Sequence, residues 1–360
     1  MRPLSFGATF VGVLLVARVA WPCGGGFGDS VEVDPAQTIL VGFFDGVETY
    51  TFNPRFCGAA TEFGLILPVP STLTQDPQLV DGEMFNAIDA LTAPTEVKEC
   101  RDSSSGVGCG GGGAKGAALG DARQNGWDPG VNVVDAGQVG IFDWVLLQAD
   151  TAAAFTDWLD ANGFPYSGTS IDHFNYYVSQ AWYFVAFRVS MGNSAPPIGS
   201  TICGDIGPLS VQFATPEIVV PSRIAAVNSD YSSPPTWRIV MVAVDQQQLS
   251  APSEPGAEPY YDSLYFAGTL SEADFEKYPA LAAIAPADSR ITTVDVTFPW
   301  SPVTDIRFET AGETKDYRTI HKTYEECGCK AASSGIFPVV IIAGGVFGCT
   351  VWVRRARRRN

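Results

Sequence analysis

Short runs of β-branched and aromatic residues dominate the middle of the chain and predict strands. Thr38–Phe44 and Thr49–Phe52 are two such runs, and the turn dipeptide Asp45-Gly46 between them predicts a β-hairpin. Trp182–Val189 is apolar at nearly every position, which is typical of a central strand that is buried on both faces. Further strands are expected at 63–67, 131–134, 139–147, 209–213, 218–220, 223–227, 237–244, 292–298 and 306–309.

Apolar residues at helical spacing interrupt these strands. The pattern over Asp81–Leu91 predicts a helix that Asp81 can cap, and a second helix is expected from Asp150, its cap, through Leu159 to a stop at Asn162-Gly163. Two more helices are expected over 171–180 and 272–283. Many short strands with few helices predict an α+β domain, with mainly antiparallel sheet and a few packed helices.

Both ends of the chain have the pattern of membrane-targeting segments. Arg2 followed by the apolar run Leu4–Ala20 is typical of a secretory signal peptide, although Arg18 fits the cleavage region badly. Lipidation of Cys23 is an alternative that Pro22, in place of a small residue, argues against. We therefore expect export.

The C-terminal pattern predicts one membrane-spanning helix. Ala331–Val353 carries no charge and is long enough for the about 20 residues that cross a hydrocarbon core of about 30 Å. Basic residues follow at once and are expected on the cytoplasmic side. These topology-determining residues are Arg354, Arg355, Arg357, Arg358 and Arg359.

These patterns divide the chain into five expected segments. They are a signal peptide (1–22), an exported domain (23–310) with a Gly-rich loop (102–130) and a second loop (250–259), a polar stalk (311–330), a transmembrane helix (331–353) and a basic cytoplasmic tail (354–360).

Charge narrows the choice of partners. The chain has 39 acidic and 22 basic residues and a net charge of −17, and several of the basic residues belong to the tail. A nucleic-acid partner is excluded because nothing in the exported part would neutralise phosphates. The acidic surface is either a solvated, self-repelling surface or a face that binds cations.

The cysteines predict disulfides if the domain is exported. The disulfide candidates are Cys57, Cys100, Cys109, Cys203, Cys327 and Cys329. Cys100 and Cys109 flank a short segment and are the favoured pair, but spacing alone does not determine connectivity. With only two histidines in the chain, a zinc site is not expected, and no other metal or cofactor is implied.

No catalytic motif stands out. His173 follows Asp172 on an expected helix, but no Gly-x-Ser-x-Gly elbow or similar nucleophile context accompanies it. Two carboxylates can hydrolyse glycosides, yet 39 acidic residues guarantee chance pairs. Tyr176 and Tyr177 could stack on sugars or on a protein, although core packing is the commoner fate of aromatic residues.

Several strings resemble a bacterial family known as domain of unknown function 2330. They are Phe63–Pro70, Met84–Pro94, Ala214–Glu217 and Asp305 before a late strand, within a resemblance that covers roughly residues 23 to 310 and departs from the family in the Gly-rich insertion. The resemblance implies a secreted or envelope-anchored bacterial protein and brings no catalytic residues. Cys327-Gly-Cys329 before the apolar segment is similar to the sorting tails of myxobacterial surface proteins.

The favoured hypothesis is a membrane-anchored envelope protein with a non-catalytic binding or structural ectodomain. Its expected partners are the membrane, through a single span, and an envelope protein or cell-wall polymer. The ectodomain is expected on the extracytoplasmic side of the cell membrane, and sorting to the cell surface stays open. The alternative is a secreted carboxylate-dependent hydrolase that acts on an envelope polymer.

Overall fold

The structure is a computed structural model that describes most of the expected exported domain and part of the expected stalk. The described residues are 25–27, 32–33, 38–53, 55–59, 64–101, 130–164, 166, 170–189, 201–205, 207–228, 236–251, 261–297 and 304–326. The expected signal peptide, nearly all of the Gly-rich loop and every residue from 327 onward lie outside them. So do Cys109, Cys327, Cys329 and the five tail arginines.

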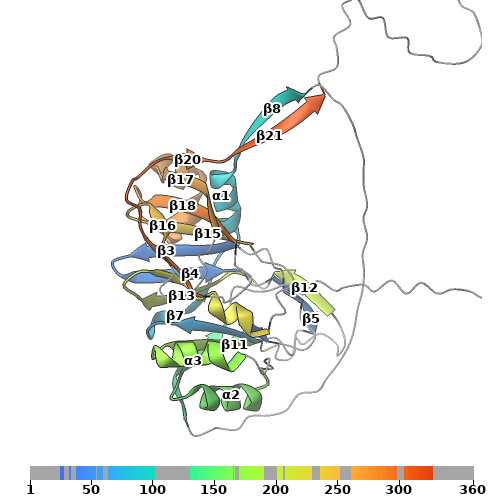
Figure 1. Cartoon of the computed structure of the whole chain (residues 1–360), viewed down its shortest axis with the longest axis vertical. Helices are drawn as coiled ribbons and strands as arrows, with labels where there is room; N and C mark the ends of the chain where they lie inside the picture. Colours follow the sequence, from blue (N-terminus) through green and yellow to red (C-terminus); the bar gives the residue numbers. More distant parts are fainter. Residues whose placement is uncertain are drawn as a thin grey trace, which may run out of the picture.

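Two large sheets form the body (Figure 1). The five-stranded sheet has the order β1 (Gly25–Phe27), β6 (Gly64–Val69), β11 (Tyr183–Val189), β10 (Phe142–Ala149), β9 (Val131–Val139). The eight-stranded sheet has the order β20 (Tyr317–Arg318), β17 (Tyr261–Thr269), β18 (Arg290–Thr297), β15 (Thr236–Ala243), β3 (Thr38–Phe44), β4 (Val47–Phe52), β13 (Leu209–Ala214), β7 (Leu73–Leu79).

Smaller sheets and helices complete the described part. The small sheets are β14 (Ile218–Val220), β19 (Ile306–Thr310) and β16 (Gln247–Leu249); β12 (Thr201–Asp205), β5 (Arg55–Ala59) and β2 (Glu32–Val33); and β21 (Ile320–Glu326) with β8 (Thr95–Arg101). The helices are α1 (Glu83–Thr92), α2 (Ala152–Ala161), α3 (Ile171–Ser179) and α4 (Glu272–Lys277), with 3-10 turns η4 (Arg223–Asn228) and η5 (Pro279–Ala283). Pairing is antiparallel except for β3 with β15 and β8 with β21, which confirms the expected α+β class with mainly antiparallel sheet.

The predicted hairpin is confirmed, and its turn shows why it forms. β3 and β4 pair antiparallel from Ile39 opposite Phe52 to Phe44 opposite Val47. Between them, Asp45 and Gly46 have φ angles of 53° and 75°. Positive φ at both central residues is the requirement of a tight type I′ turn, and Asp-Gly is one of the dipeptides that tolerate it.

The side chains of β3 alternate between two hydrophobic cores. Ile39 and Val41 are fully buried in the larger cluster, whereas Leu40 between them is buried in the second cluster with Met84 and Ile88 of α1. Successive side chains of a strand lie on opposite faces of the sheet. The eight-stranded sheet is therefore covered on one face by α1 and η5, and on the other by the larger core.

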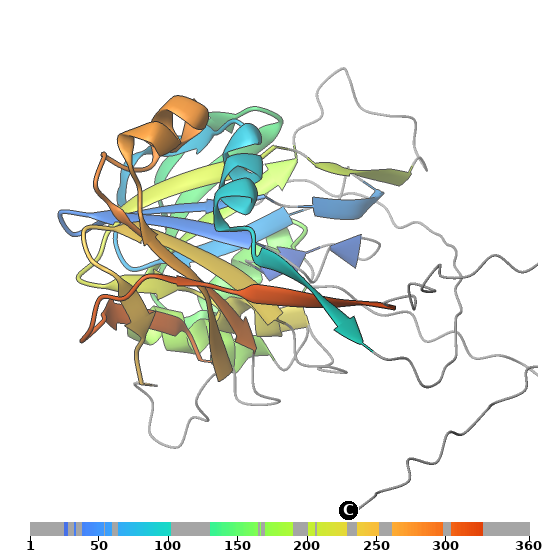
Figure 2. The same cartoon turned by 90° about the horizontal axis from the view of Figure 1, so that it is seen from above.

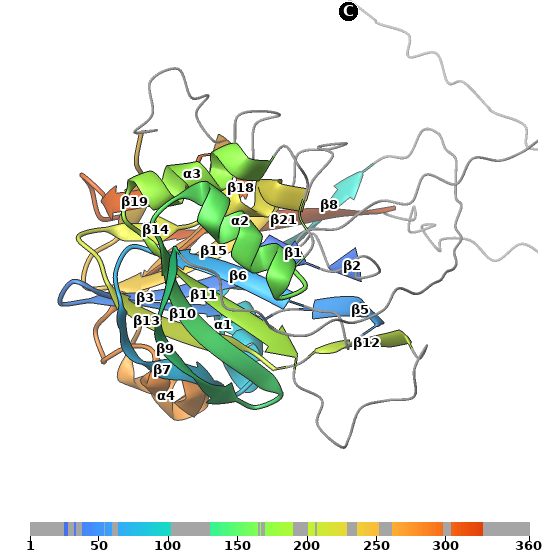
Figure 3. The same ribbon diagram turned by 90° about the horizontal axis from the view of Figure 1, so that it is seen from below.

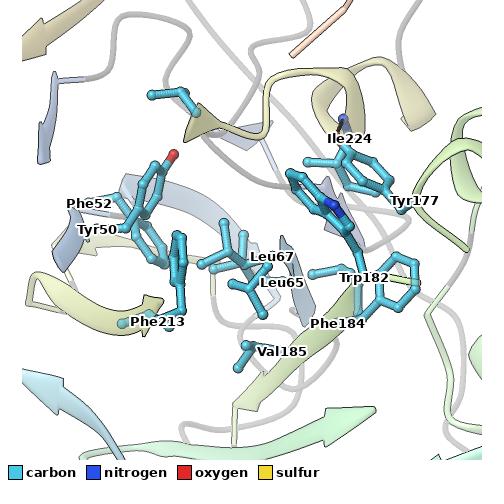
Figure 4. Close-up of a cluster of buried hydrophobic side chains, with 14 of the residues drawn as sticks. Tyr50, Phe52, Leu65, Leu67, Tyr177, Trp182, Phe184, Val185, Phe213 and Ile224 are labelled. Atoms are coloured by element: carbon cyan, nitrogen blue, oxygen red, sulfur yellow. Dashed lines mark hydrogen bonds between the residues drawn. The ribbon is translucent and has the colours of Figure 1, made fainter. Parts of the chain in front are cut away.

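The five-stranded sheet and its helices build the rest of the larger core. Leu65 of β6 and Phe184 of β11 are buried in the same cluster as Tyr50 and Phe52 of β4 (Figure 4). α2 and α3 lie side by side over this sheet (Figure 3). The ring of Phe155 on α2 stacks on Phe184 at 4.0 Å between centroids. The expected central, buried strand from Trp182 is confirmed, because β11 lies third of five and its residues from Phe184 to Phe187 are all buried.

Four local expectations need correction. Thr151, not Asp150, caps α2, since its Oγ1 accepts a hydrogen bond from the Ala154 amide at 3.1 Å. Residues 223–227, expected as a strand, form the 3-10 turn η4. The helix expected over 272–283 is interrupted at Tyr278, where Pro279 starts η5. The strand expected to end at residue 67 continues through Pro68 as part of β6. Pro68 lies beyond the described part of β1, so its missing amide costs no hydrogen bond to the described residues of β1.

β8 and β21 form a two-stranded parallel arm that extends away from the body (Figures 1 and 2). Both strands run outward, from Thr95 opposite Ile320 to Arg101 opposite Glu326. The segment expected as a stalk thus begins with β20 on the edge of the eight-stranded sheet and continues as β21 in this arm. No helix among the described residues is long and apolar enough to span a membrane, and residues 331–353 lie outside them.

Candidate functional site

Side chains that stood apart in the sequence meet where α3, η4 and β19 converge. Tyr177 comes from α3, Arg223 begins η4, and Asp305 directly precedes β19. Glu217, between β13 and β14, joins the same region through Arg307 of β19. Buried packing of α3 against η4 brings these segments together, with Ile224 and Tyr177 neighbouring in the core (Figure 4).

The centre of the site is a buried tyrosine–aspartate pair. The Tyr177 hydroxyl donates to Oδ1 of Asp305 at 2.6 Å, and the amide of Ile224 donates to the same hydroxyl at 3.2 Å. The Arg223 amide also donates to Asp305 Oδ1, at 3.1 Å. Tyr177 is 0% exposed and Asp305 is 7% exposed. The pair therefore fastens α3 to the start of η4 and to the segment that leads into β19.

Burial controls the protonation of this pair. Loss of solvent raises the pKa of Asp305 from 3.8 to about 6, although hydrogen bonds from Tyr177 and the Arg223 amide and the charges of Arg307 and Arg223 act in the opposite direction. The pKa of Tyr177 is raised well above its usual value of 10.0, first by burial and then by the Asp305 charge. The tyrosine therefore remains a hydrogen-bond donor at neutral pH, whereas the carboxyl group of Asp305 titrates at about pH 6.

Two partly exposed arginines lie close enough for their charges to act on the pair. The guanidinium of Arg223 lies 4.1 Å from the ring centroid of Tyr176, a cation–π contact. Arg307 forms an ion pair with Glu217 through Nη1 and Oε1, and both side chains are partly exposed. Tyr176 is half-buried and interacts with both Arg223 and Arg307. The aromatic residues of α3 therefore contribute to packing and to holding cations.

Glu48 is a functional candidate that the sequence did not single out. It lies on β4, is 0% exposed, and accepts a hydrogen bond at Oε2 from the Val219 amide of β14 at 2.9 Å. Burial raises its pKa well above 4.5, against the Val219 hydrogen bond and the Arg307 charge. Its signal was present in the pattern, because Glu48 shares the strand phase of the buried Tyr50.

Four buried polar atoms near these groups have no hydrogen-bond partner among the described residues. They are Glu48 Oε1, Asp305 Oδ2, Arg307 Nε and His173 Nδ1. His173 is a poor base for nucleophilic catalysis, since burial and the charge of Arg223 lower its pKa more than Asp172 raises it. Buried polar atoms usually find a partner in protein or ordered water. The arrangement can therefore hold protons on its buried carboxyl groups.

The described residues form no metal-ligand cluster, and three of the disulfide candidates lie on their strands. Across the described ranges, no three His, Cys, Asp or Glu side chains gather closely enough to hold a metal ion. Of the disulfide candidates, Cys57, Cys100 and Cys203 lie on β5, β8 and β12, respectively. The favoured Cys100–Cys109 pair stays a prediction, because Cys109 is outside the described residues.

Comparison with known proteins adds one finding. A bacterial family described as "Uncharacterized protein conserved in bacteria (DUF2330)" matches residues 19–309, which is most of the chain. The match includes the five-stranded sheet, the eight-stranded sheet apart from β20, and the site. No curated protein and no solved structure matches the chain.

Proposed function

Because the chain belongs to the bacterial DUF2330 family, whose description assigns no activity, we propose its function from its own residues. The protein is an exported, membrane-anchored envelope protein whose ectodomain binds another envelope component, either a protein or a cell-wall polymer. The observation that carries this proposal is that the ionisable groups which meet in the candidate site are occupied in holding the fold together. Tyr177 and Asp305 bind each other inside the fold, and Glu48 joins β4 to β14.

The arm supports the anchored part of the proposal. β21 runs away from the body and ends at Glu326, shortly before the uncharged segment that begins at Ala331 (Figure 1). An apolar segment of that length followed by arginines is typical of a single span with a cytoplasmic tail. In this arrangement the arm separates the ectodomain from the membrane surface.

The alternative function, a carboxylate-dependent hydrolase, is favoured by one observation. Burial raises the pKa of both Glu48 and Asp305, and the charge of Arg307 acts on both carboxyl groups. Raised carboxyl pKa values are a property of general acids in glycoside hydrolysis. Glu48 is 0% exposed and Asp305 is 7% exposed, which argues against direct contact of either carboxyl group with a polymer.

A single assay separates the two functions. The ectodomain is incubated with purified cell-wall sacculi, and both its cosedimentation and the release of soluble fragments are measured. We expect no release of soluble fragments. We also expect wild type, Asp305→Asn and Glu48→Gln to cosediment with the sacculi to the same extent. Fragment release that either substitution abolishes would establish the hydrolase instead.

Anchoring is tested separately by fractionation. Alkaline carbonate is expected to leave the full chain in the membrane and to release a variant that lacks residues 331–360. Extraction of the full chain by carbonate would contradict the anchor. Crosslinking in intact cells, with the 331–360 deletion as the matched control, then identifies a protein partner if sacculi do not bind.

A further inference from the structure

The three-stranded sheet β12-β5-β2 places two cysteines from distant parts of the sequence in direct register. β5 and β12 pair antiparallel, and Cys203 is the residue opposite Cys57. On the other side of β5, Cys57 lies opposite Glu32 of β2. The sequence had marked both cysteines as disulfide candidates without a partner for either.

This register satisfies the distance requirement for a disulfide. Directly opposite residues in an antiparallel pair have Cα atoms about 4.5 or 5.5 Å apart and occupy the same face of the sheet. Disulfides need Cα separations of about 4.4–6.8 Å. Both kinds of antiparallel position fall within that Cα range, and the non-hydrogen-bonded position, where side chains lie closer together, fits the bond better.

Cys100 provides an internal contrast. It lies on β8 of the arm, where the parallel register places Glu325, not a cysteine, opposite to it. Among the cysteines in the described strands, Cys57 and Cys203 are therefore the two that the sheet register brings together. A pairing between residues this far apart in sequence is information that spacing along the chain does not contain.

We propose that Cys57 and Cys203 form a disulfide that joins β5 to β12. The proposal rests on the export that the proposed function includes, because disulfides persist in oxidising compartments. A thiolate of one cysteine attacks an oxidised dithiol or glutathione disulfide and releases one thiolate from it. The second cysteine, after losing its proton, attacks the mixed disulfide and releases the other thiolate. The two cysteines lose two protons and two electrons in total, and the external disulfide gains both electrons.

The bond constrains the unfolded chain by closing a long loop. The segment between the two cysteines contains β6, α1, β10, α2, α3 and β11, which include most of the five-stranded sheet. In the chain-entropy account, cross-links across longer loops remove more freedom from the unfolded state. Reduction is therefore expected to lower the melting temperature of the oxidised protein.

The test equilibrates the purified, reduced full chain with a mixture of reduced and oxidised glutathione. Free thiols are then alkylated under denaturing conditions, and proteolytic peptides are mapped by mass spectrometry with and without reduction. We expect a crosslinked pair of peptides that contain Cys57 and Cys203 and that separate on reduction. Alkylation of both cysteines as free thiols, or crosslinks from either to another cysteine, would overturn the proposal.

Matched variants sharpen the result. Cys57→Ser is expected to make Cys203 fully alkylatable, whereas Cys100→Ser leaves the Cys57–Cys203 crosslink intact. A Cys203 that still resists alkylation in Cys57→Ser is bonded elsewhere and contradicts the proposal. Because glutathione is supplied in vitro, the outcome does not depend on residues 1–22, so a failure of native export would leave this result unchanged.

Discussion

The hydroxyl of Tyr177 donates a 2.6 Å hydrogen bond to Asp305, a residue 128 positions further along the chain, inside the core. This bond connects helix α3, which covers the five-stranded sheet, to the entrance of β19 in a separate small sheet. Substitution of either residue therefore probes how the layers of the body are held together, and the first two predictions use this pair.

Tyr177→Phe is expected to lower the free energy of unfolding by about 1–3 kcal/mol, because the Ile224 amide and Asp305 each lose a buried hydrogen-bond partner. Urea unfolding of the ectodomain measures the change. Tyr317→Phe is the control, since Tyr317 is 43% exposed on β20 and its loss is expected to cost less than about 0.5 kcal/mol. Equal effects of the two substitutions would contradict a stabilising role for the pair.

Asp305 is expected to make the protein less stable as pH rises from about 4 to about 6. Its pKa in the folded state is about 6, above the usual 3.8, so the folded protein binds the proton more tightly than the unfolded chain does. The contribution of this proton is complete below pH 3.8 and is lost as pH passes 6. The difference amounts to roughly 3 kcal/mol.

Asp305→Asn removes this titration while keeping an oxygen acceptor for Tyr177. The stability of wild type relative to Asp305→Asn is therefore expected to fall between pH 4 and pH 7, as measured by urea unfolding at a series of pH values. A constant difference across that range would show that Asp305 has an ordinary pKa.

Glu48→Gln is expected to change stability by less than about 1 kcal/mol, whereas Glu48→Leu costs about 1–3 kcal/mol. The raised pKa of Glu48 favours its neutral form, which glutamine resembles, and glutamine retains an acceptor for the Val219 amide. Leucine has a similar size but leaves that amide without its acceptor. Comparison of the two variants in urea checks the prediction, and a larger loss from glutamine would indicate that the charge itself is needed.

Gly46→Ala is expected to destabilise the protein by about 1–2 kcal/mol through backbone strain, because Gly46 has φ of +75° in the hairpin turn. Space is not the cause, since an added Cβ would meet only the Thr215 carbonyl oxygen, at 3.7 Å. The matched control is Gly312→Ala, where an added Cβ meets nothing within 4 Å. Thermal unfolding of both variants tests the prediction, which fails if the control loses as much stability.

Local patterns were sufficient where neighbouring residues decide the conformation. The Asp45-Gly46 turn, the helix from Ile171 and the buried strand after Trp182 were all predicted from sequence and are present in the structure. The expected strand at 223–227 was wrong, because its apolar residues fit either a strand or a single turn packed against α3. Periodicity alone does not separate these two structures over so few residues.

The candidate site was only partly predictable. His173, Tyr177, Glu217 and Asp305 all appeared in the sequence discussion, but nothing indicated that they lie together. Glu48 was missed because an acidic residue on a strand is usually exposed, and its burial depends on the β14 amide that it accepts from. The strand register that places Cys203 opposite Cys57 likewise could not be read from spacing along the chain.

By itself, the sequence determined the short-range features of this protein: the strand-rich composition of its α+β body, the tight hairpin, the helices and the family to which the chain belongs. These depend on backbone preferences and on the period of apolar residues, both of which act over a few positions. Only the tertiary structure decided which polar residues share a buried environment and which cysteines lie opposite each other in strand register. Those relationships arise when segments far apart in the chain pack together, because burial and register, rather than residue type, then set the pKa values and the partners.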